Sequence, residues 1–146
     1  MAFVCTPTLT MTQYTAQPSV LIVDSDPDLR LALTTRLEYE GYEVETAVDG
    51  TACLTRLRQR TFHAVLLNVM LPDRPCASTL NELGIIRPTL PVILMTALGP
   101  VTWDEGDHAP RAILTFPFQP KELISVLQKV MGSDIPLRQR LNSCRW

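Results

Sequence analysis

The sequence contains no long hydrophobic run. Its longest apolar stretch, residues 64–71, is interrupted by Asn68, whereas a membrane-spanning helix needs about 20 apolar residues. The first residues also lack the basic and apolar segments of a signal peptide. We therefore expect a cytoplasmic protein that makes no contact with a membrane.

The chain also lacks an excess of charge of either sign. Its 13 basic and 15 acidic residues leave a formal net charge of −2, whereas nucleic-acid-binding domains carry a strongly basic face. We therefore expect no nucleic acid among its partners. Lysine is scarce, because only Lys121 and Lys129 are present.

The four cysteines, Cys5, Cys53, Cys76 and Cys144, are scattered and include no C-x-x-C pair. A zinc site needs clustered ligands, so metal binding through cysteine is not expected. With 146 residues, of which 46% are hydrophobic, the chain can bury one core without disulfides. We expect free thiols, and an alternative role for Cys76 as a reactive sensor thiol stays open.

Short apolar runs that alternate with helical patterns fill the sequence from residue 19 to residue 132. Apolar runs of four or five residues are typical of parallel strands buried on both faces. Together with right-handed crossovers, they predict an α/β domain with a doubly wound parallel sheet and helices on both faces. The expected strands cover residues 20–23, 44–48, 64–67, 91–95 and 112–114, and an Asp-Gly turn is expected at 49–50.

Residues outside this range show no usable period. Residues 1–18 are rich in Thr and are expected to form a flexible leader, with Met11 as an alternative start of translation. Residues 133–146 form a tail, which is either a docking segment or a disordered end. Residues 98–110 hold two Gly and two Pro, so we expect any helix there to be short or irregular.

Doubly wound sheets bind ligands at the carboxyl ends of their strands. The residues that end or follow the first, third, fourth and fifth expected strands are Asp24, Asn68, Thr96 and Phe116. No G-x-G-x-x-G loop, no G-x-S-x-G elbow and no paired His–Cys or His–Asp motif accompanies them. These absences argue against an enzyme of another class on this fold, and we expect no enzymatic activity.

These strand ends and their flanks resemble the receiver domains of response regulators in two-component signalling. The motifs that carry the resemblance are VLIVDSDPDLR (residues 20–30), EGY (40–42), DG (49–50), LLNVMLPD (66–73), PVILMTA (91–97) and FPF (116–118). The resemblance covers residues 19–132. It implies a five-stranded, flavodoxin-like sheet with strand order 2-1-3-4-5.

The resemblance also implies a phosphorylation pocket at the carboxyl edge. In the family, two acidic residues after the first strand and an acceptor aspartate hold magnesium, and a Thr or Ser and a Lys bind the phosphoryl oxygens. This sequence keeps Asp24 and Thr96 at the matching positions. It departs at three others, with Ser25 for the second acid, Asn68 for the acceptor and Phe116 for the lysine.

Each departure removes a chemical function. The neutral amide of Asn68 is a poor nucleophile, so covalent transfer is not expected. Magnesium prefers carboxylate oxygens, so its binding is expected to be weak or absent, with Asp24, helped by Asp26, as the weak metal candidate. Phe116 carries no positive charge to stabilise phosphoryl oxygens, and it is expected to pack where the lysine stem would lie.

Three residues of this pocket have more than one interpretation. Asn68 either mimics a fixed signalling state or is a tolerated relic. Asp24, if it holds no metal, either caps the following helix or faces solvent. Thr96 is either a switch hydroxyl or an ordinary Thr that closes a strand. The family's aromatic switch position corresponds to Ile113, which we expect to be a plain core residue.

The sequence therefore predicts a stand-alone pseudo-receiver that signals by protein contact. The expected partner is a histidine kinase or another signalling protein. The alternative is a phosphorelay receiver that uses a non-standard acceptor or binds phosphate without a covalent bond.

Overall fold

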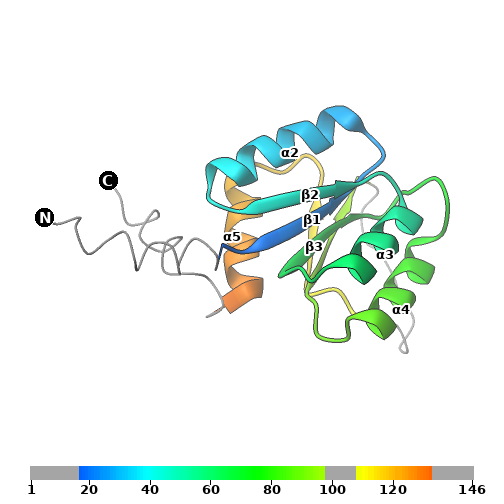
Figure 1. The fold of residues 1–146 in the computed structure, drawn as a ribbon. Coiled ribbons are helices and arrows are strands. Elements are labelled where there is room, and N and C mark those ends of the chain that lie inside the picture. Colours follow the sequence, from blue (N-terminus) through cyan, green and yellow to red (C-terminus); the bar gives the residue numbers. More distant parts are fainter. Residues whose placement is uncertain (1–16, 98–107, 133–146) are drawn as a thin grey trace, which may run out of the picture.

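The computed structural model describes residues 17–97 and 108–132. Its sheet has five parallel strands in the order β2-β1-β3-β4-β5 (Figure 1). The strands are β1 (Ser19–Val23), β2 (Glu43–Ala47), β3 (Ala64–Asn68), β4 (Val92–Thr96) and β5 (Ala112–Thr115). The helices between and after them are α2 (Pro27–Tyr39), α3 (Gly50–Gln59), α4 (Cys76–Ile86) and α5 (Pro120–Met131). The predicted doubly wound sheet and its strand order are confirmed.

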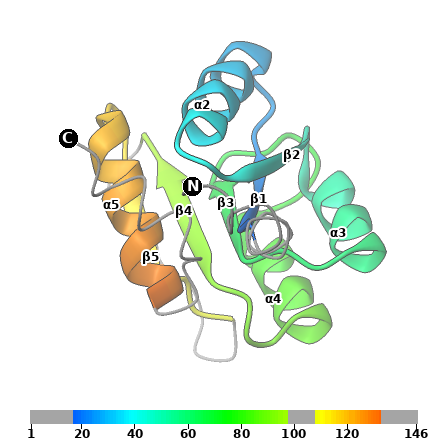
Figure 2. The same cartoon turned by 60° about the vertical axis from the view of Figure 1, so that its left-hand side comes forward.

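The helices cover the two faces of the sheet in pairs (Figure 2). Helices α3 and α4 pack on one face, against strand residues such as Leu21 and Val23. Helices α2 and α5 pack on the other face, against Val20 and Ile22. Because successive side chains of a strand point to opposite faces, the uninterrupted apolar run of β1 serves both layers.

The ends of α2 and α5 follow signals that the sequence displays. Pro27 begins α2, and the Asp26 carboxylate caps it by accepting the Asp28 N–H at 2.9 Å. Gly41, with a positive φ of 100°, lies just beyond its last turn. A reciprocal pair of bonds between Gln119 and Glu122 opens α5.

The domain edges differ slightly from the predicted ones. Gln17 and Pro18, assigned to the leader, contact the start of β2: the Gln17 amide donates to the Gly41 carbonyl at 2.7 Å, and the Glu43 N–H donates to the Pro18 carbonyl at 2.8 Å. The predicted leader up to residue 16 and the tail 133–146 lie outside the described residues. Within the described part, no helix is long and apolar enough to cross a membrane.

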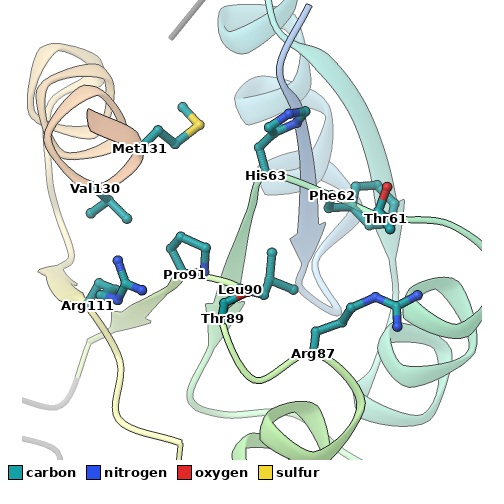
Figure 3. Close-up of a pocket in the computed structure, with 10 residues that line it drawn as sticks. All are labelled: Thr61, Phe62, His63, Arg87, Thr89, Leu90, Pro91, Arg111, Val130 and Met131. Carbon is teal, nitrogen blue, oxygen red and sulfur yellow. The ribbon is translucent and has the colours of Figure 1, made fainter. Parts of the chain in front are cut away.

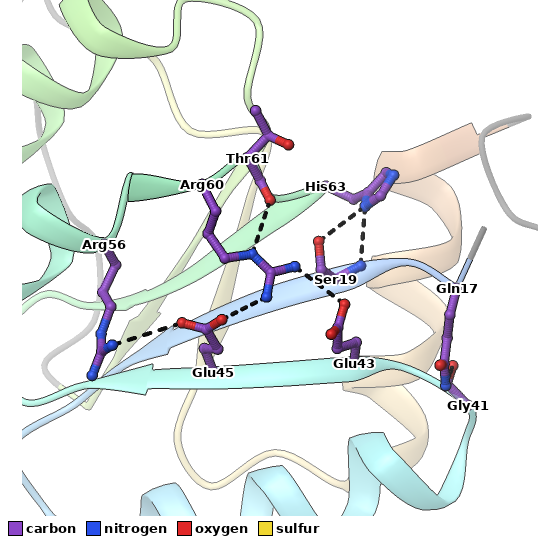
Figure 4. Close-up of polar contacts among 9 residues, drawn as sticks. All are labelled: Gln17, Ser19, Gly41, Glu43, Glu45, Arg56, Arg60, Thr61 and His63. Carbon is purple, nitrogen blue, oxygen red and sulfur yellow. Dashed lines mark hydrogen bonds and ion pairs between the residues drawn. The ribbon is translucent and has the colours of Figure 1, made fainter. Parts of the chain in front are cut away.

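Strand β2 lies at an edge of the sheet and is tied to α3 by charge. Arg60, which follows α3, donates to Glu43 at 3.1 Å and also bonds Glu45, while Arg56 pairs with Glu45 at 3.8 Å (Figure 4). The Arg60 guanidinium also lies over the Phe62 ring, 4.7 Å from its centre. One side chain therefore joins α3, β2 and the loop before β3.

The start of α3 corrects the predicted Asp-Gly turn, because Gly50 is the first helical residue and Asp49 its cap. The Asp49 carboxylate accepts the Ala52 N–H at 2.8 Å. Asp73, from the loop after β3, accepts the N–H groups of Gly50 at 3.0 Å and Thr51 at 2.9 Å. Two aspartates thus satisfy the first three amides of the helix, which otherwise lack partners.

Position 50 requires a glycine because the loop after β3 and helix α4 lie very close to its backbone. A Cβ atom at this position would lie 2.7 Å from Arg74 Cδ and 2.7 Å from the hydroxyl of Thr79. Since the Thr79 side chain is fully buried, it has little room to move. The absence of a side chain at Gly50 therefore lets α3 and α4 approach each other at this end.

We predict that Asp73→Asn lowers stability in a pH-dependent manner. Partial desolvation works to raise the pKa of Asp73, but hydrogen bonds from Thr51 and Gly50 outweigh it, so the pKa is lowered. A lowered folded-state pKa gives stability that is present above the unfolded pKa and lost as pH falls through the folded one. The variant should lose about 0.5–1 kcal/mol at about pH 7, as for other helix caps, and almost nothing at about pH 2.

Urea unfolding at both pH values measures this difference. Asp28→Asn, at an exposed position in the first turn of α2, is the control for removal of a surface charge. An equal loss at both pH values would contradict the role given to the Asp73 charge.

Candidate functional site

The candidate site lies at the carboxyl edge of the three central strands. Asp24 directly follows β1, while Asn68 and Thr96 are the last residues of β3 and β4. These strands are neighbours in register, with Val23 beside Leu67 and Asn68 beside Met95. Asp24 and Thr96 are buried, with 2% and 1% of their surface exposed. The topology therefore brings together residues separated by 44 and 28 positions in the sequence.

Asn68 and Asp24 are joined by a direct hydrogen bond. The Asn68 Nδ2–H donates to Asp24 Oδ2 at 2.7 Å. The other carboxylate oxygen, Oδ1, accepts the Asp26 N–H at 2.8 Å. On the opposite side, Asn68 Oδ1 accepts the Met70 N–H at 2.7 Å. These bonds fix which end of the amide faces the carboxylate.

The environment of Asp24 corrects one sequence interpretation. Asp24 neither caps α2 nor faces solvent, because Asp26 is the cap and Asp24 is buried. A buried carboxylate needs hydrogen-bond donors to offset its lost hydration. Asn68 and the Asp26 amide supply them, and the Arg30 guanidinium donates to the Asp24 carbonyl at 2.7 Å.

The oxygen atoms at this edge do not form the set that magnesium prefers. Both Asp24 carboxylate oxygens accept protein hydrogen bonds, and Asn68 turns its NH₂ group toward them. Ser25 is exposed, and one oxygen of Asp26 caps α2. Across the residues that the structure describes, no three His, Cys, Asp or Glu side chains are grouped to hold a metal ion. A hard cation such as magnesium usually binds one or two carboxylates with free oxygens.

Phe116 packs along the seam between α2 and α5. Its backbone N–H donates to the Thr96 carbonyl at 2.8 Å, which places it at the end of β5. Its half-buried ring lies 4.9 Å from that of Phe118. Together with α2 residues such as Leu29 and Leu33, the two rings line an apolar cavity of about 240 Å³. The phenyl group thus adds apolar contacts where the family places a charged lysine.

Ile113 is not the core residue that the sequence predicts. It lies in β5 with 39% of its surface exposed, while its neighbour Leu114 is buried against α2 and α5. Successive side chains of a strand point to opposite faces of the sheet, so Ile113 points away from the face on which Leu114 is buried. Strand β5 also lies at the edge of the sheet. The irregular helix predicted for residues 98–110 falls almost wholly outside the described residues.

Sequence reasoning missed two anchors, one at each edge of the sheet. Asp73, 23 residues from Gly50, holds the start of α3. His108 packs against Gly84 of α4, where a Cβ atom would lie 2.6 Å from the His108 Cβ, and its Nε2 bonds the Leu90 carbonyl at 2.8 Å. A glycine inside a helix was the one available signal, since it often marks a close approach.

The family model for the response regulator receiver domain matches residues 20–128. The chain belongs to this family. It is therefore a receiver domain of two-component signalling, and its fold agrees with this assignment.

The similar proteins include longer regulators and single receivers. The probable transcriptional regulatory protein TcrX of Mycobacterium tuberculosis is 39% identical over 79 residues, which are 54% of this chain and 34% of that protein. The CpxR homolog of Haemophilus influenzae is 33% identical over 119 residues, which are 77% of this chain and 49% of that protein. This receiver thus spans between a third and a half of these relatives.

A solved structure supports the fold alone. The CheY-like receiver domain protein of Methanospirillum hungatei superposes with a TM-score of 0.74 at 24% identity. The match covers 81% of this chain and 96% of that one.

We predict that Asn68→Asp destabilises this receiver. The variant places a second carboxylate against the buried Asp24 and removes a donor, so like charges repel at hydrogen-bond distance. The expected loss is about 1–3 kcal/mol near pH 7. The crowded pair binds protons more tightly in the folded state, so the loss should grow as pH rises and shrink below about pH 4, where a shared proton restores a donor.

Urea unfolding in chelator, repeated at several pH values, measures this effect. Asn81→Asp makes the same chemical change at an exposed position of α4, and it should alter stability by less than about 0.5 kcal/mol. If Asn68→Asp were as stable as the parent, the pocket would be open and well hydrated.

Proposed function

We propose that this receiver is a pseudo-receiver, which signals by contact with a protein partner and accepts no phosphoryl group. The observation that carries the proposal is the hydrogen bond from the neutral Asn68 amide to the buried Asp24 carboxylate. In this arrangement an amide stands at the acceptor position. Its nitrogen is engaged with Asp24 and its oxygen with Met70.

The chemistry of the remaining residues supports the proposal. An amide lacks the charge that makes a carboxylate a nucleophile. Phosphoryl transfer also needs cations around the developing negative charge. Phe116 provides none, and the Arg30 guanidinium is already bound to the Asp24 carbonyl. The two lysines lie in α5, with exposed Lys121 in its first turn and Lys129 in its last. We therefore propose that the protein is not an enzyme and binds magnesium weakly or not at all.

The same bonds favour the interpretation that Asn68 mimics one fixed signalling state over the interpretation that it is a tolerated relic. Asn68 bonds Asp24, which directly follows β1, and Met70 in the loop after β3, so it holds the start of that loop in place. Met70 in this loop has 62% of its surface exposed, and Val48, after β2, has 49%. Exposed apolar side chains at the carboxyl edge are suited to a protein contact.

The partner that fits this role is a histidine kinase or another signalling protein of a two-component system. We further propose that the contact takes place in the cytoplasm, where the thiols of Cys53 and Cys76, which form no disulfide, stay reduced. Burial raises the pKa of Cys53 to about 12, so this thiol stays protonated and unreactive.

We predict that a small-molecule phosphodonor will not modify the protein. Incubation with acetyl phosphate and magnesium should leave the intact mass unchanged, because no carboxylate stands at position 68. The triple variant Ser25→Asp/Asn68→Asp/Phe116→Lys, which restores all three departures, is the positive control and should gain one hydroxylamine-labile phosphate. Asn68→Asp alone should react poorly.

A labile phosphate on the parent protein would overturn the proposal. Peptide mapping of that phosphate to Asp26, an exposed carboxylate at the same edge, would favour the alternative phosphorelay receiver with a non-standard acceptor. Saturable binding of phosphate without a mass change would favour the non-covalent form of that alternative.

We also predict that magnesium produces no saturable heat in calorimetry up to about 5 mM, because Asp24 already has donors for both oxygens. The triple variant should bind in this range. For Asn68→Asp, added magnesium should recover only part of the lost stability, since Ser25 is a poor ligand. Tight binding by the parent would show that Asp24 and Asp26 assemble a site after all.

A further inference from the structure

A cavity of about 360 Å³ lies at the amino edge of the sheet, at the opposite end of the strands from Asp24 and Asn68. Cavities that bind small molecules usually measure about 300–1,000 Å³. Its walls come from the loops before β3 and β4, the start of β5 and the end of α5 (Figure 3). Residues far apart in the sequence thus form one hollow.

The cavity is basic, although the chain as a whole is slightly acidic. Among the residues that the structure describes, its lining includes His63, Arg87 and Arg111 but no acidic residue, whereas the chain has a net charge of −2. A second hollow of about 360 Å³ shares Arg111 and Val130 with the first and adds Lys129, and none of its described lining residues is acidic. The two hollows therefore form a continuous basic region around Arg111.

One of these basic residues, Arg87, binds the carbonyl groups of two helices. The C-terminal ends of α3, α4 and α5 meet this edge, and their last carbonyls carry partial negative charge. Arg87 donates to the Leu57 carbonyl of α3 at 2.7 Å and to the Ile86 carbonyl of α4 at 3.1 Å. In Figure 3 its guanidinium extends toward α3 and away from the other lining residues. Arg87 therefore has a structural role.

Arg111 has no such role in the described part of the chain. Its backbone N–H donates to the Val92 carbonyl at 2.8 Å, which aligns the start of β5. Its guanidinium makes no hydrogen bond or ion pair with any other residue that the structure describes. Figure 3 shows it below Val130 and to the left of Pro91. Its five N–H donors remain free to bind an anion.

His63 offers a second donor. Its Nδ1 accepts the Ser19 backbone N–H at 3.0 Å, and the Ser19 hydroxyl lies 3.2 Å away (Figure 4). Since Nδ1 is an acceptor, the proton of the neutral ring must be on Nε2. The ring therefore holds an N–H that no residue of the described part accepts.

Apart from Thr61 and Thr89, the rest of the lining is apolar. Leu90 and Met131 are each only 5% exposed, and Pro91 and Val130 lie beside them. A bare inorganic ion would leave these surfaces without a contact. A ligand with an anionic head and an apolar body would meet both parts of the cavity.

We propose that this cavity binds a small organic anion, either a carboxylate or a phosphate monoester attached to an apolar group. Arg111 binds the anionic head, and the apolar body lies over Pro91, Leu90 and Val130, with His63 at the far side of the cavity (Figure 3). The proposal is independent of the pseudo-receiver function, because it concerns the opposite edge of the sheet. Its failure would leave the Asn68–Asp24 site unaffected.

The test is an NMR titration of the full-length ¹⁵N-labelled protein with benzoate, phenyl phosphate and inorganic phosphate in separate experiments. At least one of the two aromatic anions should shift the amide signals around His63, Arg111 and Val130 in a saturable manner, with a Kd near about 1 mM or below. Comparison of benzoate with phenyl phosphate identifies the preferred head group. Inorganic phosphate should bind at least about tenfold more weakly than the preferred aromatic anion, because it lacks an apolar body.

Two variants assign the binding to Arg111. Arg111→Gln keeps a polar side chain of similar reach and should weaken binding by about tenfold. Lys121→Gln, which removes one charge at the other end of α5, should change the Kd by less than about twofold. The absence of saturable shifts up to about 10 mM, equal binding by Arg111→Gln and the parent, or equal affinity for the inorganic and aromatic anions would each overturn the proposal.

Discussion

The hydrogen bond between the Asn68 amide and the Asp24 carboxylate organises the carboxyl edge of this receiver. It joins the ends of two neighbouring central strands, where an isolated buried carboxylate would cost several kcal/mol. A charge-assisted hydrogen bond contributes about 1.5–3 kcal/mol, which offsets part of that cost. Because the other end of the amide holds the Met70 N–H, the same residue also directs the chain into the next loop. A single neutral side chain thus links the ends of β1 and β3 and holds the start of the following loop.

The two edges of the sheet differ in how far their polar groups are engaged. At the carboxyl edge, both oxygens of Asp24 and both ends of the Asn68 amide have protein partners. At the amino edge, Arg87 is engaged with helix ends, whereas Arg111 has no side-chain partner in the described part of the chain. At the edge where this fold class usually binds ligands, the Asp24 and Asn68 side chains are therefore satisfied by protein groups, whereas Arg111 at the other edge has no side-chain partner among the described residues.

The strands were predictable from the sequence to within about one residue. Strand β1 was expected at residues 20–23 and is found at Ser19–Val23, because a parallel strand buried on both faces produces a continuous apolar run. The meeting of Asp24, Asn68 and Thr96 at one edge also follows from the topology. The identity of the helix cap did not follow, since Asp24 and Asp26 are both placed to cap α2 and only their burial separates the two roles.

Features that depend on distant contacts were not predictable. The Asp-Gly pair at 49–50 resembles a turn, but Asp73, from another loop, helps to make it the start of a helix. The exposure of Ile113 depends on the edge position of β5, which the strand order implied by the resemblance contains, but the apolar run at residues 112–114 alone indicates a buried residue. The orientation of the Asn68 amide, likewise, is set by groups on two other segments of the chain.

The ion pairs along β2 have a consequence for association between molecules. An edge strand exposes backbone groups that can pair with a strand of another chain, and charged side chains on such a strand oppose this. Glu43 and Glu45 put two negative charges on β2, and Arg60 and Arg56 hold them in defined positions. An incoming strand would have to displace or bury these ion pairs, at a cost in desolvation. The network that fixes α3 to the sheet therefore also protects this edge against aggregation.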